Sequence, residues 1–155
     1  MISEALFARY LSAFVEERQK ASEELPLPTH AHTHVLTPDD ISHAYQLARI
    51  VNHHQGIHPI SAASETYQWN LNLPELARIW TNGCIIRSAL MEQLMGILAQ
   101  TNRILVHPEM ANFAQKHRNT LNQTVQAALQ SGIAIPCYSA AINFLHGYAE
   151  TDSPM

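Results

Sequence analysis

The spacing of apolar residues predicts helices along almost the whole chain. Over residues 2–22, apolar side chains recur at steps of three and four, as on one face of a helix: Ile2, Leu6, Phe7, Tyr10, Leu11 and Phe14. Pro26, Pro28 and a run of alternating histidines then interrupt the pattern, so a loop is expected over residues 23–37. A loop of about a dozen residues is longer than most connections in compact domains and suggests a functional or solvated segment.

Capping residues predict where the later helices begin. Thr37 is a good N-cap, and Pro38 followed by two aspartates suits a first helical turn, so a helix is expected from there to about Tyr67. Pro59 inside this helix predicts a kink, because proline removes a backbone hydrogen bond. Further helices are expected over residues 72–80, 84–100, 108–131 (ended by a glycine) and 136–150, with a frayed tail at 150–155.

The chain offers no convincing strand and no glycine-rich phosphate loop. Neither GxGxxG nor GxxxxGK[ST] occurs, and the whole sequence contains five glycines. We therefore predict a single all-α domain over residues 1–155, a bundle of about six helices. Four aromatic residues at helical spacing are expected in its core: Tyr10, Trp69, Trp80 and Phe144.

Composition narrows the class of protein. Apolar residues make up 46% of the 155 residues and charged residues 14%, which excludes a disordered tail and suggests a surface reserved for a partner. A net charge of −4 argues against nucleic acid, and no apolar run approaches the ~20 residues of a membrane span. Cys84 and Cys137 are far apart, and Glu4 stands where a signal peptide would be basic. We expect a soluble cytoplasmic protein whose cysteines are packing residues.

Histidines form two clusters with metal-binding potential. The first, His30, His32 and His34, alternates within the predicted loop, and in the second His54 and His58 have the i, i+4 spacing that lets two imidazoles share an ion. Neither cluster has the glutamate of HExxH or a pair of cysteines. A solvated loop is the favoured interpretation and no metal site is assigned, although a histidine-rich metal-binding helical protein stays an alternative.

Residues 69–88 carry the most informative pattern. Ala77 and Trp80 are followed by the unbroken run Gly-Cys-Ile-Ile-Arg-Ser over residues 83–88, and the whole resembles the helical C-terminal domain of the decarboxylating 6-phosphogluconate dehydrogenases. Residues 4–9, 55–56 and 132–141 extend the similarity in the same order, whereas His58 and Pro59 depart from the family's apolar pattern. The resemblance implies an all-helical fold like the second half of that domain.

The same resemblance implies a chain that catalyses no reaction on its own. Family members bind NADP on a separate N-terminal domain, and their catalytic lysine and glutamate precede the part matched here. No catalytic or cofactor-binding residue and no cofactor are therefore assigned to this chain. Oxidative decarboxylation needs a hydride acceptor, a base and an acid, so no activity is expected from it alone. Arg87 has a matching position as a phosphate-binding arginine, and the alternative is an arginine that pairs with a carboxylate or covers apolar surface.

Three functional hypotheses follow. The first is a non-catalytic helical module that forms a homodimer through apolar helix faces and binds substrate phosphate, since this domain supplies most of the dimer contact in the family. The second is a subunit of a split dehydrogenase, completed by a chain with the cofactor domain, or a regulator that pairs with an intact dehydrogenase. The third is the histidine-rich metal-binding protein.

Overall fold

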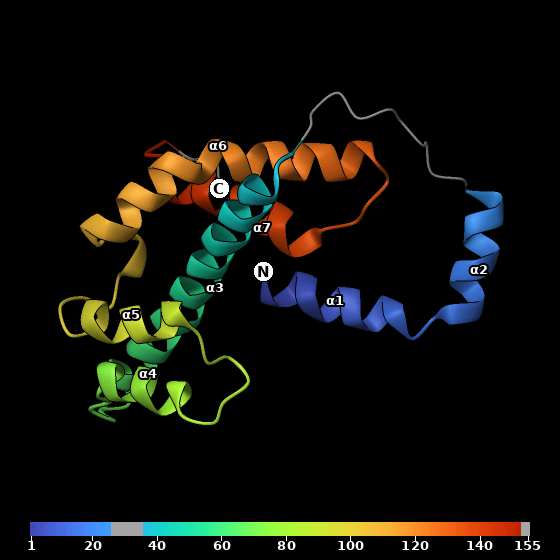
Figure 1. The fold of residues 1–155 in the computed structure, drawn as a ribbon. Helices are drawn as coiled ribbons and strands as arrows, with labels where there is room; N and C mark the ends of the chain where they lie inside the picture. Colours follow the sequence, from blue (N-terminus) through green and yellow to red (C-terminus); the bar gives the residue numbers. More distant parts are fainter. Residues whose placement is uncertain (26–35, 153–155) are drawn as a thin grey trace. The chain divides into compact units, whose positions relative to one another are not determined.

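The computed structural model describes residues 1–25 and 36–152, and in these residues it contains helices and no strand (Figure 1). The helices are α1 (Ile2–Ser12), α2 (Val15–Glu24), α3 (Pro38–Thr66), α4 (Leu73–Thr81), α5 (Ala89–Leu98), the 3-10 turn η1 (Ile104–Val106), α6 (Pro108–Gln130) and α7 (Pro136–Ala149). The prediction of an all-α fold is confirmed. The described residues form seven α-helices rather than about six, because the first predicted helix is divided.

The division between α1 and α2 lies at Ala13 and Phe14. The Ser12 hydroxyl donates to the carbonyl of Arg9 at 2.6 Å, and a side chain bonded back to its own helix competes with regular helical hydrogen bonding. Phe14 leaves helical geometry, with φ −85° and ψ 59°, and its ring packs edge-on against that of Tyr10. The acidic first turn of α2 then starts a new helix, which runs to Glu24 and so reaches into the predicted loop.

Two helix ends match the sequence prediction closely. At the start of α3, the Thr37 hydroxyl accepts from the Asp40 backbone N–H at 3.1 Å, and the Asp40 carboxylate accepts from the Thr37 backbone N–H at 2.9 Å. At the end of α6, Gly132 has φ +70°, and the N–H of Ile133 donates to the carbonyl of Ala128 at 2.8 Å. This is a Schellman end, which requires the left-handed conformation that glycine adopts easily.

α3 ends close to its predicted end at about Tyr67, whereas α5 differs from its predicted course. Pro59 lies inside α3, which runs on to Thr66. α5 begins at Ala89 and not near Cys84, because Ser88 is extended and its hydroxyl accepts from the N–H of Met91, as an N-cap does. No helix in the described part of the chain is both long enough and apolar enough to cross a membrane.

The chain divides into two compact units, residues 1–48 with 117–155 and residues 49–116. In the second unit α4 packs against α5. The core of that unit is apolar and includes Val51, Ile57, Ala77, Met91, Leu94, Ile97 and Ile104. In the first unit the core residues include Ala44, Leu47, Leu121, Val125, Ala141 and Leu145, and α1 lies against α7.

α1 and α2 bury no residue. Ile2, Leu6 and Tyr10 follow one another at four-residue steps on α1, with exposed fractions of 68, 63 and 64%. The prediction that Tyr10 belongs to the core is therefore wrong. It is also wrong for Trp69, which is exposed and stacks on Tyr67 with ring centroids 5.3 Å apart, whereas Trp80 and Phe144 are partly buried.

Candidate functional site

The candidate site is the turn between α4 and α5, residues 82–88, which contains Arg87. Asn82 ends α4, and Gly83 has φ +78°, a left-handed conformation that favours glycine. The backbone N–H of Arg87 donates to the carbonyl of Cys84 at 3.1 Å. The glycine and this hydrogen bond make residues 83–87 a tight turn that leads directly to the N-cap of α5.

Ser88 joins this turn to two helices. Its hydroxyl oxygen accepts from the N–H of Met91 at 3.3 Å and from Nη2 of Arg49, on α3, at 2.6 Å. Ser88 must be the acceptor from Arg49, because a guanidinium group has only donors. The residue that follows Arg87 is therefore bonded both to its own helix and to a side chain 39 residues away.

The Arg87 side chain is exposed, and in the described residues no hydrogen bond or ion pair engages its guanidinium. Arg78, on α4, is a useful contrast within the same unit. Its Nε and Nη2 donate to the two Glu75 carboxylate oxygens at 2.7 and 2.6 Å. This pairing raises the pKa of Arg78 and lowers that of Glu75. Of these two arginines, only Arg87 has no carboxylate partner in the described residues.

Two isoleucines of the turn were not singled out from the sequence. Ile85 is fully exposed and Ile86 is 40% exposed, beside Arg87. An apolar run gives no local signal of exposure, because the same pattern usually marks a buried segment. The turn therefore presents an arginine and two apolar side chains together.

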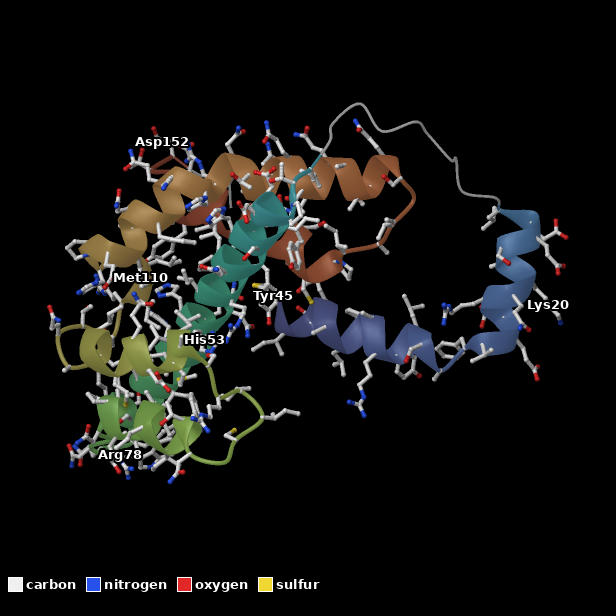
Figure 2. All side chains as sticks on the ribbon, viewed as in Figure 1. Lys20, Tyr45, His53, Arg78, Met110 and Asp152 are labelled. Atoms are coloured by element: carbon white, nitrogen blue, oxygen red, sulfur yellow. The ribbon has the colours of Figure 1, made fainter. Side chains whose placement is uncertain are left out.

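Two neighbouring histidines, His53 and His54, follow Arg49 along α3. His53 is labelled in Figure 2. Its Nδ1 is 2.7 Å from the carbonyl oxygen of Arg49, one helical turn earlier. Burial lowers the pKa of His53; the hydrogen bond with the Arg49 carbonyl opposes this shift, and the Arg49 charge adds a smaller lowering. The pKa of the buried His54 is also lowered, first by burial and then by the charge of His58.

The candidate metal-binding histidines are only partly described. His54 is buried and His58 exposed, with ring centroids 6.0 Å apart. Among residues 1–25 and 36–152, no group of three or more histidine, cysteine, aspartate or glutamate side chains is placed to hold a metal ion. His30, His32 and His34 lie outside the described residues. Sequence patterns did not identify a stacked pair in the first unit, His43 and His117, whose ring centroids are 4.0 Å apart.

Cys84 and Cys137 are free thiols, both partly buried, as expected for residues that pack rather than cross-link. Cys84 lies in the turn, yet nothing in the described residues pairs it with a base in the manner of a nucleophile. The distinctive chemical group of the turn is therefore the Arg87 guanidinium, held on a backbone fixed at Cys84 and Ser88.

Comparison with known proteins places this turn in a family. The family model described as "6-phosphogluconate dehydrogenase, C-terminal domain" matches residues 1–155, the whole chain. The chain belongs to this family. The 6-phosphogluconate dehydrogenase (decarboxylating) of Citrobacter freundii is 33% identical over 159 residues, covering 99% of this chain and 36% of the relative. The enzyme of Escherichia coli K12 is 33% identical over 153 residues, covering 96% and 33% respectively.

A solved structure supports the same family membership. The 6-phosphogluconate dehydrogenase of Plasmodium falciparum matches 97% of this chain with a TM-score of 0.88 and 27% sequence identity. That enzyme is described in its apo form, with its cofactor NADP+ and with its substrate 6-phosphogluconate. The match covers 34% of its chain, so the present chain spans about a third of the length of the relatives it matches.

Proposed function

We propose that this member of the 6-phosphogluconate dehydrogenase C-terminal domain family binds substrate phosphate through Arg87 and self-associates through its helices. We also propose that the 155 residues alone carry out no dehydrogenation. The observation that carries the proposal is the exposed Arg87 guanidinium on a turn held at both ends. Family membership supplies the class of ligand, a phosphorylated sugar acid.

The chemistry of Arg87 suits a phosphate. A guanidinium group can donate two parallel hydrogen bonds to phosphate oxygens, and it keeps its charge at all physiological pH values. Because no carboxylate of the described residues pairs with Arg87, a phosphate has no internal competitor to displace. Arg78 lacks this advantage, since Glu75 already occupies its donors.

The same turn is unsuited to catalysis on its own. Oxidative decarboxylation requires a base for the hydroxyl that is oxidised and an acid for the enol that remains, besides a hydride acceptor. A guanidinium group stays protonated near neutral pH and cannot exchange protons in this way. The turn therefore supports binding of the phosphate end of a substrate, and chemistry requires groups beyond it.

Self-association is supported by the exposed face of α1. Ile2, Leu6 and Tyr10 form a continuous apolar stripe of three large side chains, each more than 60% exposed. Phe7 and Leu11 on the neighbouring face line a groove with Ala134 and Pro136, so they already lie beside another part of the same unit. A large exposed apolar stripe favours association with a second protein surface. We propose a second copy of this chain as that partner; an intact dehydrogenase or a cofactor-domain chain is the alternative.

Isothermal titration calorimetry with 6-phosphogluconate tests the binding proposal. Wild-type protein is expected to give saturable heat, and Arg87→Ala is expected to weaken binding at least about tenfold, because a charge-assisted bidentate contact is lost. Arg103→Ala is the matched control, since it removes another exposed arginine of the same unit and is expected to bind normally. Gluconate, which lacks the phosphate, is the ligand control. Absence of heat at millimolar ligand, or equal affinity in Arg87→Ala, contradicts the proposal.

A further inference from the structure

A second arginine is connected to the turn that carries Arg87. Arg49 lies on α3, and its Nη2 donates to the Ser88 hydroxyl at 2.6 Å. Hydrogen bonds from a charged donor are shorter and stronger than those between neutral groups. This contact joins two segments 39 residues apart, and it meets the chain at the residue directly after Arg87.

We propose that Arg49 is a positioning residue for Arg87, which acts through Ser88 and does not itself contact the ligand. This inference rests on the proposed phosphate-binding function. Arg87 is held on one side by its own N–H, bonded to Cys84, and on the other by the Ser88 side chain, bonded to Arg49 and Met91. These bonds fix the backbone on both sides of Arg87, and with it the point from which its exposed side chain starts.

Arg49 is well placed to be a support. It is partly buried within the long helix α3, and its carbonyl oxygen lies 2.7 Å from Nδ1 of His53. Its guanidinium therefore extends from an ordered helix to the turn. Preorganising a binding group lowers the entropic cost of fixing it when the ligand arrives, so a broken Arg49–Ser88 contact costs affinity without removing any group that touches phosphate.

A double-mutant cycle in the 155-residue protein tests this role. Arg49→Ala and Ser88→Ala are each expected to weaken 6-phosphogluconate binding about tenfold, the effect of losing one hydrogen bond to a charged group. The double variant is expected to show less than the sum of the two single losses, because both changes break the Arg49–Ser88 contact. Arg49→Lys and Ser88→Thr keep a cationic donor and a hydroxyl acceptor, and both are expected to restore most of the affinity.

Circular dichroism at the temperature of the titration separates positioning from folding. If Arg49→Ala does not fold, Arg49→Lys and the Ser88 pair carry the test, with Ser88→Ala weakened and Ser88→Thr restored. Unchanged affinity in folded Arg49→Ala, or additive losses in the double variant, overturns the positioning role. If these results accompany normal wild-type binding that Arg87→Ala abolishes, only the role of Arg49 is wrong. Absence of binding in the wild type overturns the phosphate function and this role together.

Discussion

His53 and His54 make the stability of the second unit sensitive to acid. Burial lowers the pKa of both in the folded protein, whereas in the unfolded chain each titrates near its ordinary value of 6.5. Above pH 6.5 both states hold these imidazoles neutral, so the full stability is present. As pH falls below 6.5, the unfolded chain binds protons first and the free energy of unfolding decreases.

We predict that the free energy of unfolding, measured by urea denaturation, is constant from pH 7.5 to about pH 6.5 and falls steadily from there to pH 5. Each histidine contributes a slope of at most about 1.4 kcal/mol per pH unit. Replacing both residues by glutamine is expected to reduce this slope, whereas His146→Gln, at an exposed position on α7, is expected to keep it. An unchanged slope in the double variant means that these two imidazoles are not its source.

Single residues were predictable where a local pattern marks them. Arg87 stands in an unbroken motif of six residues, so the sequence alone identified it. Arg49 could not be found in this way, because its bond to Ser88 joins positions 39 residues apart and leaves no periodic signal. His43 and His117 illustrate the same limit, since their stacked rings come from two helices far apart in the sequence, α3 and α6.

At the scale of elements, the N-cap of α3 is a direct test of the helix rules. Thr37→Ala removes the hydroxyl that accepts from the Asp40 N–H, and we expect it to lower the free energy of unfolding by about 1 kcal/mol. Thr37→Ser keeps the acceptor and is expected to cost far less. Thermal denaturation of the two variants provides the measurement, and equal midpoints contradict a capping role for the hydroxyl.

Predicted helix boundaries were wrong at two places where a serine side chain bonds to the backbone. Ser12 and Ser88 each form a hydrogen bond with the backbone that ends or begins a helix, yet the apolar spacing around both runs on as if the helix continued. The late start of α5 follows from the Ser88 cap, whereas the Ser12 bond accompanies the end of α1. The end of α3 was predicted well, because the helix runs through Pro59 to Thr66, close to the expected end at about Tyr67.

At the scale of the whole molecule, self-association is the property that can be tested most directly. We predict that sedimentation velocity at tens of micromolar protein detects a dimer, and that Leu6→Glu shifts it to monomer by placing a charge in the apolar stripe of α1. Gln19→Glu adds the same charge on α2 and is expected to leave the dimer intact. A monomeric wild type, or a Leu6→Glu variant that remains dimeric, excludes this stripe as the contact.

The fold class was predictable because helical spacing, capping residues and a family motif all agree over most of the chain. The exposure of Tyr10 and Trp69 was not, since aromatic residues at helical spacing usually indicate a core and the sequence does not say which faces meet. The division into two compact units could not be predicted either, because its boundaries lie inside α3 and α6, where the helical spacing continues without a break.

The most direct test of the central claim, phosphate binding at the turn before α5, is an amide chemical-shift titration of 15N-labelled protein with 6-phosphogluconate. The claim predicts saturable shifts at the N–H groups of Cys84 to Met91 and around Arg49, with none on α1, and their loss in Arg87→Ala. Saturable shifts confined to other helices, or no shifts at millimolar ligand, contradict it.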